Sequence, residues 1–81
     1  MTVSVKLFAA ARELAGSEEV QLELREGASA GDARAALAQQ WPRLAPLVDR
    51  SLLAVNAEYV ADETVITAGD ELALIPPVSG G

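Results

Sequence analysis

Hydrophobic and polar residues alternate in two segments near the start of the chain, residues 2–7 and residues 20–26. A repeat of two residues places successive side chains on opposite faces of a β-strand. The pattern therefore predicts two half-buried strands, the second ending at Glu26-Gly27. Residues 8–16 between them are rich in helix-forming residues and close with a glycine, which predicts a short helix with a left-handed cap. This connection leaves the relative direction of the two strands open.

The main helix is predicted to begin at Ser29. This serine stands three residues before Asp32, which is the spacing of a capping box at a helix start. Alanine and leucine then recur at helical spacing up to residue 40, and Pro42 disfavours continuation of the helix. We expect Arg34 and Gln39 on its solvent-facing side. The many small alanines would allow the helix to approach a sheet closely.

The second half of the chain predicts a loop followed by further strands. Residues 42–50 contain two prolines and no clear period, so we expect a loop with a single helical turn. The remaining segments are a β-forming run at 51–55, a turn at 56–58, short β-forming pieces at 59–60 and 64–66, and a final strand at 71–75. The final strand is apolar on both faces, which favours a central position. Together these elements predict an α+β fold with one sheet of four to five strands on one main helix.

Two aromatic residues stand at element boundaries and allow alternative interpretations. Phe8 lies between the first strand and the short helix, where a core position is the expectation and a partner contact is the alternative. Trp41 lies at the end of the main helix. We expect it to cover the edge of the core, with a ligand platform as the alternative.

Composition removes most classes of catalytic site. The chain has 81 residues, enough for one core, and contains neither cysteine nor histidine, so disulfides, thiol catalysis and the commonest metal ligands are excluded. We predict no metal site and no cofactor bound by this chain. Adjacent acidic residues, as at Glu18-Glu19, point to opposite faces of a strand and are expected to be solvated surface charges. A stand-alone enzyme is therefore not expected.

Charge and hydropathy indicate the kind of partner. The net charge of −6 opposes binding to nucleic acid or anionic membranes, and it favours a partner with a basic surface. No apolar run approaches the length of a membrane span, and the N-terminus does not read as a leader. The sequence therefore predicts a cytoplasmic protein.

The last six residues, Pro76-Pro77-Val78-Ser79-Gly80-Gly81, carry the strongest functional signal. Two prolines favour an extended arm that leaves the sheet, and six extended residues span about 20 Å. Two glycines then make a tip without side chains, suited to a narrow channel in another protein. A terminal Gly-Gly also occurs as mere slack at a chain end.

The terminal carboxylate offers a chemistry that needs no other group of this chain. Attack by a carboxylate oxygen on the α-phosphate of ATP, in a partner enzyme, gives an acyl-adenylate with a good leaving group. Sulfide or a thiol then displaces AMP, which leaves a thiocarboxylate or a thioester on Gly81. The chain would thus act as a carried reagent.

Several segments of the chain resemble the small subunits of molybdopterin synthase, which are ubiquitin-like sulfur carriers. The resemblance rests on Leu7-Phe8-Ala9, Ala11-Arg12-Glu13-Leu14-Ala15-Gly16, Val55-Asn56-Ala57-Glu58-Tyr59-Val60, and above all the block from Gly69 to Gly81. It covers the whole length and implies a β-grasp fold with a mixed sheet, formed by residues 1–75, and an extended tail at 76–81. Ala57 departs from the family, which often has glycine at this turn.

The resemblance also implies partners and residue roles. A ubiquitin-activating-type enzyme would adenylate Gly81 with ATP, and the tail would enter the large subunit of molybdopterin synthase to sulfurate the cyclic pyranopterin precursor. Two small and two large subunits would form a heterotetramer. Gly81 would bear the thiocarboxylate, with Gly80 providing clearance. The partner-binding residues would be Phe8, Ile75, Pro76, Pro77, Val78 and Ser79.

Two other functions remain open from the sequence. A sulfur carrier of the thiamine pathway would share the fold and the terminal Gly-Gly. A ubiquitin-like modifier or interaction module would instead use Gly81 to form isopeptide bonds with lysines, or would not use it at all. The Pro-Pro-Val-Ser arm and the Ala-Arg-Glu-Leu-Ala-Gly segment favour the molybdopterin carrier.

Overall fold

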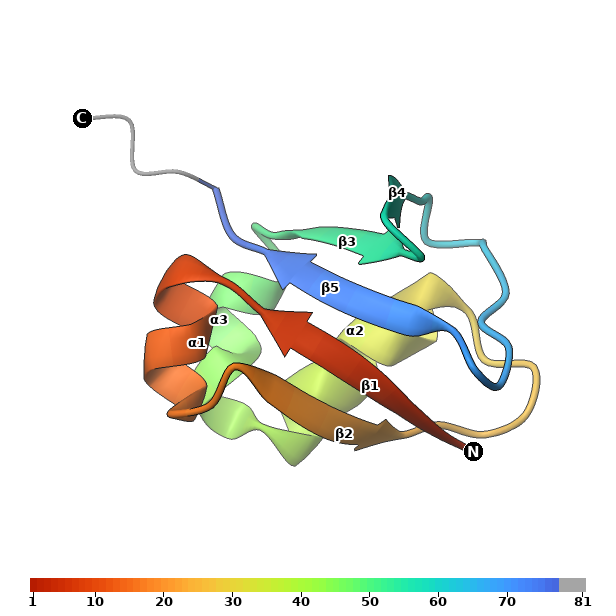
Figure 1. Cartoon of the computed structure of the whole chain (residues 1–81), viewed down its shortest axis with the longest axis horizontal. Helices are drawn as coiled ribbons and strands as arrows, with labels where there is room; N and C mark the ends of the chain where they lie inside the picture. The colour runs from red at the N-terminus through yellow and green to blue at the C-terminus, as the bar shows by residue number, and fades with distance from the viewer. Residues whose placement is uncertain (78–81) are drawn as a thin grey trace.

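A computed structural model of the chain describes residues 1–77. The elements are β1 (Thr2–Leu7), α1 (Ala9–Ala15), β2 (Glu19–Glu23), α2 (Ala30–Gln40), the 3-10 helix η1 (Pro42–Leu44), α3 (Ala45–Val48), β3 (Leu52–Val55), β4 (Glu58–Tyr59) and β5 (Glu71–Ile75). The strands form one sheet in the order β2-β1-β5-β3-β4, in which only β1 and β5 are parallel. The helices cover one face of this sheet and leave the other face open (Figure 1). The predicted α+β class and mixed sheet are confirmed.

The core lies between the sheet and the helices. Alternate residues of β1 and β5 face the helices, and α2 contributes Ala33 and Leu37 to the same layer. The largest fully buried side chains are Val5, Leu22, Leu37, Leu44, Val48, Leu53, Ile66, Leu72 and Leu74. Strand β5 is hydrogen-bonded on both sides, to β1 and β3, as its two apolar faces predicted.

The start and end of α2 follow the local sequence signals. The Ser29 hydroxyl accepts a hydrogen bond from the Asp32 amide at 3.1 Å, and the Asp32 carboxylate accepts one from the Ser29 amide at 2.9 Å. The helix ends at Gln40 with Trp41 as its cap, directly before Pro42. The capping box and the proline stop are thus confirmed.

The expected solvent position of Arg34 is wrong. Its side chain is only 19% exposed, because the guanidinium reaches from α2 to two neighbouring segments. It donates to the Val48 carbonyl at 2.7 Å and to Asp62 Oδ1 at 3.0 Å. Gln39, in contrast, is exposed as expected.

Three expected boundaries also differ from the structure. Residues 42–50 form η1 and α3 rather than a loop with one turn, because each proline sits in a first helical turn, where its missing N–H costs little. The second strand ends at Glu23, three residues early, although the next residue, Leu24, is still buried. Residues 64–66 contribute an isolated bridge between Ser29 and Val65 instead of a strand.

The β3–β4 hairpin turns at Asn56 and Ala57, both of which have positive φ, 50° and 71°. A two-residue turn with left-handed conformation at both positions is the mirror-image type I′ turn, which favours glycine. Alanine at the second position carries a steric cost because its Cβ approaches the carbonyl oxygen. Glycine adopts this conformation without that cost, which is consistent with the glycine that the resemblance led us to expect at this turn.

Replacing Ala57 with glycine should therefore stabilise the protein by roughly 0.5 kcal/mol. This figure is the strain relieved at the left-handed position minus the extra conformational entropy that glycine gives the unfolded chain. Urea unfolding of the wild type and the variant measures the difference. Ala35→Gly is the matched control, since Ala35 is an exposed residue inside α2. It should destabilise by about 1 kcal/mol. Equal destabilisation by both changes would contradict the strained turn.

Candidate partner-binding site

The open face of the sheet carries a continuous set of small and apolar side chains. Cross-strand pairing aligns one row through Lys6, Ala73, Ala54 and Tyr59, which come from β1, β5, β3 and β4. A second row pairs Leu52 with Ile75. Paired residues lie on the same side of a sheet, so both rows face away from the helices.

Phe8 lies on this open face and not in the core, so the expected core position is wrong. The side chain is 45% exposed. The physical reason is strand alternation: Leu7 points into the core at 2% exposure, so the next residue points to the other side. Ala9 then adopts a positive φ of 51°, which turns the chain into α1 directly after Phe8. The alternative, that Phe8 contacts a partner, remains a prediction.

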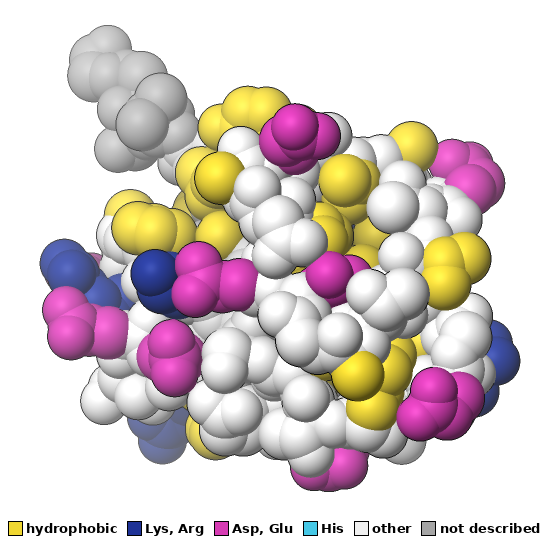
Figure 2. Space-filling model, turned by 45° about the vertical axis from the view of Figure 1, so that its right-hand side comes forward, with side chains coloured by type: hydrophobic (Ala, Val, Ile, Leu, Met, Phe, Trp, Pro, Cys, Tyr) yellow, Lys and Arg dark blue, Asp and Glu magenta, His cyan; other side chains and the backbone are white. Residues whose placement is uncertain are grey.

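We name this surface the open-face patch, comprising Phe8, Leu52, Ala54, Tyr59, Ala73 and Ile75. Most of these residues line a groove of about 320 Å³, whose floor is formed by the two alanines. Leu52 and Tyr59 are 53% and 65% exposed. Figure 2 shows hydrophobic side chains gathered on part of the surface that it draws. A contiguous exposed patch of this kind is typical of an interaction site.

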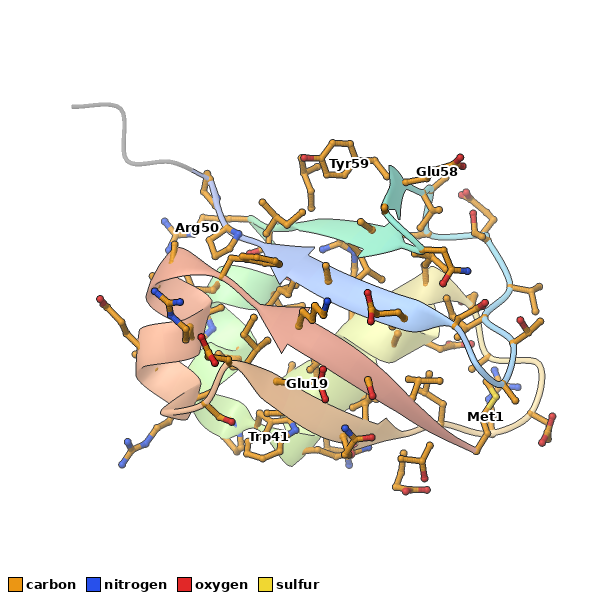
Figure 3. The ribbon with its side chains drawn as sticks, in the orientation of Figure 1. Met1, Glu19, Trp41, Arg50, Glu58 and Tyr59 are labelled. Atoms are coloured by element: carbon orange, nitrogen blue, oxygen red, sulfur yellow. The ribbon has the colours of Figure 1, made fainter. Side chains whose placement is uncertain are left out.

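Charged residues border the open-face patch. Lys6 and Glu71 form an ion pair across the strands, with Nζ 3.3 Å from Oε1. Glu58 precedes Tyr59 at the β4 edge (Figure 3), but it pairs with the core-facing Val55 and so belongs to the other side of the sheet. Figure 2 shows both acidic and basic side chains scattered over the face that it draws. The Lys6–Glu71 pair thus places charges of both signs at the border of the open-face patch.

The open-face patch surrounds the point where the chain leaves the sheet. Ile75 ends the central strand β5, Pro76 is buried against the body, and Pro77 is exposed. The predicted positions Val78, Ser79, Gly80 and Gly81 lie outside the described residues. Of the candidate site residues, the structure brings together Phe8, Ile75, Pro76 and Pro77.

A turn at residues 67–70 holds the start of β5. The Asp70 carboxylate accepts hydrogen bonds from the Thr67 amide at 2.8 Å, the Thr67 hydroxyl at 3.0 Å and the Asn56 side-chain amide at 2.9 Å. Asn56 in turn accepts from the Glu71 amide at 3.0 Å. The hydrogen bond from the Thr67 amide, followed by that from Asn56, lowers the pKa of Asp70 below its usual value. The network ties the β3–β4 hairpin to the strand that leads to the tail.

The network makes one contribution to stability dependent on pH. Because the folded pKa of Asp70 is lowered, its contribution is present above the unfolded value, near 3.8, and is lost as pH falls through the folded value. Asp70→Asn should therefore flatten the acid limb of stability measured by urea unfolding between neutral pH and pH values below 3.8. Glu63→Gln, at an exposed position, is the control. An acid limb unchanged by Asp70→Asn would contradict this role.

A second apolar surface lies at the far end of α1. Leu14, Ala15, Trp41 and Pro42 line a groove there, and Leu14 is 41% exposed. Trp41 packs against the edge of the core, as expected from its position at the helix end. Figure 3 places it on the side of the molecule opposite Tyr59. This surface provides matched controls for the open-face patch.

Two further observations concern only residues 1–77. No group of three or more acidic, histidine or cysteine side chains there is arranged to hold a metal ion. No helix in that range has the length and apolar character needed to cross a membrane.

Comparison with known proteins places these features in a family. The sequence profile of the ThiS family matches residues 5–81. The chain belongs to the ThiS family. The predicted resemblance to molybdopterin synthase small subunits is confirmed: this ThiS-family chain is 40% identical to a molybdopterin synthase sulfur carrier subunit from Chlamydomonas reinhardtii, over 100% of both chains.

The chain is similarly close in sequence to a small archaeal modifier protein. The ThiS-family chain is 42% identical to small archaeal modifier protein 1 from Haloferax volcanii, over 94% of this chain and 97% of the relative. The crystal structure of SAMP1 from the same organism superimposes with a TM-score of 0.88 at 38% identity, covering 100% of both chains. The ubiquitin-like β-grasp fold is thereby confirmed.

Sequence reasoning missed four members of the open-face patch: Leu52, Ala54, Tyr59 and Ala73. They come from three different strands, and only the pairing register brings them together. Alternation around Leu7 was a signal that could have placed Phe8 on the open face. No local signal could have shown that β3 and β4 lie beside β5.

Proposed function

We propose that this chain carries sulfur for molybdenum cofactor biosynthesis as a thiocarboxylate on Gly81. The observation that carries the proposal is the full-length match to a molybdopterin synthase sulfur carrier subunit. The surface is consistent with it, because the chain emerges from a central strand inside the open-face patch. Such a surface could bind a partner while the tail reaches that partner's active site.

The partner in this proposal is the large subunit of molybdopterin synthase. The open-face patch would bind it, with Phe8 and Ile75 as apolar anchors. The net charge of −6 on the whole chain would favour a basic surface on that subunit. Pro77, Val78 and Ser79 would then span the entry to the pocket, and Gly80 would fit its narrowest part. Two copies of each subunit would form a heterotetramer. Catalytic groups that handle the pterin would belong to the large subunit.

Charging of the tail requires a ubiquitin-activating-type enzyme. A carboxylate oxygen of Gly81 attacks the α-phosphate of ATP, pyrophosphate leaves, and an acyl-adenylate forms. A sulfur donor then attacks the carbonyl carbon and AMP leaves, so that after release from the donor one terminal oxygen has been replaced by sulfur. The sulfur is transferred to the cyclic pyranopterin precursor, and the spent carboxylate is charged again.

A second function is favoured by the match to small archaeal modifier protein 1. In this case the activated Gly81 would acylate lysine side chains of other proteins. The two functions share the adenylation step and differ in the nucleophile, which is sulfur for the carrier and an amine for the modifier. One chain could serve both.

Sulfur transfer to a defined acceptor separates the candidates. The purified thiocarboxylate form is mixed with the large synthase subunit and cyclic pyranopterin precursor, and in parallel with the thiazole-forming system of thiamine synthesis. We expect sulfur to appear in the pterin. Sulfur appearing only in thiazole would reject the proposal. Gly81-dependent conjugates in cells, without transfer to either acceptor, would favour the modifier.

A further inference from the structure

Lys6 is the single lysine in the sequence, since the other five basic residues are arginines. It lies next to the C-terminal end of β1 and lines the groove of the open-face patch together with Phe8 and Ile75. The side chain is 47% exposed, and its ammonium group pairs with Glu71 across the neighbouring strand. The lysine amine on this surface therefore lies in the same groove as Ile75, the last residue of β5.

Other nitrogen groups compete poorly for an acyl donor. Arginine guanidinium groups stay protonated and are not acylated under ordinary conditions. The Met1 amino group is partly buried and donates to the Leu24 carbonyl at 2.6 Å. Lys6 Nζ is thus the exposed primary amine among residues 1–77.

We propose that Lys6 is an acceptor site for self-conjugation, in which its Nζ takes up the activated carboxyl group of Gly81 from a second copy of this chain. The inference rests on the proposed function, because it requires activation of Gly81. The neutral amine of Lys6 attacks the carbonyl carbon of the acyl-adenylate, a C–N bond forms, and the C–O bond to AMP breaks. AMP leaves and the two ammonium protons go to solvent.

The course of β5 favours a second copy over the chain's own tail. Lys6 is aligned with Ala73, and β5 runs from there through Ile75 to the buried Pro76. The chain therefore leaves the sheet in the direction away from Lys6. An intramolecular bond would require the last residues to reverse across the open-face patch.

Conjugation at Lys6 would also close the open-face patch. It removes the positive charge that pairs with Glu71, and it places the tail of another chain in the groove. Binding of the large subunit to the same groove would cover Lys6. Self-conjugation and synthase assembly therefore exclude each other, and a free carrier in excess over the large subunit is the form that becomes conjugated.

The test uses the full chain with ATP and a ubiquitin-activating-type enzyme, without large subunit. No arginine or lysine follows Arg50, so trypsin leaves residues 51–81 attached to the acceptor. We expect a branched peptide that joins residues 51–81 to Lys6 of residues 1–12, with cleavage at Lys6 blocked. The variant Lys6→Arg keeps a positive charge opposite Glu71 and should not form this branched peptide.

Activation is scored separately by exchange of pyrophosphate into ATP, which reports adenylation of Gly81. The inference would be overturned if the wild type and Lys6→Arg both exchanged pyrophosphate but the wild type formed no branch at Lys6. A branch at Met1, or a cyclic monomer as the only product, would overturn it as well. Absence of exchange in both proteins would instead overturn the proposed function. The two failures are therefore distinguishable.

Closure of the open-face patch has its own control. Lys6→Arg combined with Gln39→Lys moves the lysine to an exposed position on α2, on the helical side of the sheet. The conjugate at Lys6 should bind the large subunit at least about tenfold more weakly than the free chain, as expected when a central anchor is covered. The conjugate at position 39 should bind normally. Equal weakening in both conjugates would contradict closure of the groove.

Discussion

Phe8→Ala weakens binding of this chain to the large subunit of molybdopterin synthase at least about tenfold, or about 1.4 kcal/mol. The reason is its place in the open-face patch, where a 45%-exposed ring stands beside Ile75 at the root of the tail. Aromatic anchors near the centre of an interface carry much of the binding energy. Isothermal titration with uncharged chain measures the effect without any sulfur chemistry.

Leu14→Ala is the matched control for this change. Leu14 is 41% exposed, lies in the last turn of α1, and lines the groove next to Trp41, away from the open-face patch. Its removal should change the affinity by less than about twofold, as expected for a residue outside an interface. If Leu14→Ala weakened binding as much as Phe8→Ala, the partner would bind elsewhere or the loss would reflect stability.

We expect deletion of Gly81 to abolish the proposed sulfur transfer and to leave the fold and the open-face patch intact. The shortened tail ends one residue, about 3.3 Å, short of the adenylation and transfer sites. A displacement of that size removes reacting atoms from productive geometry. Pterin sulfuration in the reconstituted system measures the loss, and titration with the large subunit measures retained binding.

Extending the tail by one residue tests the same requirement for tail length in the opposite direction. Adding one glycine after Gly81 keeps the tip free of side chains but moves the carboxylate by the same distance in the other direction. It should also fail to support transfer. Normal transfer by either the shortened or the extended chain would contradict a fixed position for the terminal carboxylate.

The sequence predicted the elements whose signals are local. Alternation defined β1, the capping box placed the start of α2, and the apolar character of Leu72 to Ile75 on both faces placed β5 in the centre of the sheet. Each of these signals depends on residues close together in the chain. Their physical causes, side-chain period and helix capping, act over a few residues.

The features that were predicted wrongly or missed depend on contacts between residues far apart in the sequence. Arg34 was expected in solvent because its helical position is compatible with exposure, but Val48 and Asp62 attract its guanidinium from two other segments. The open-face patch likewise requires the register of β3 and β4 against β5. Pairing over such separations is set by the whole fold, so the residues themselves do not reveal it.

Intact mass tests most directly whether Gly81 is converted to a thiocarboxylate. The chain is expressed with and without its activating enzyme and sulfur donor, and the masses of the two preparations are compared. We expect replacement of one terminal oxygen by sulfur, only when both partners are present and never when Gly81 is deleted. An unchanged mass in the presence of active partners, or the same change in the chain without Gly81, would contradict it.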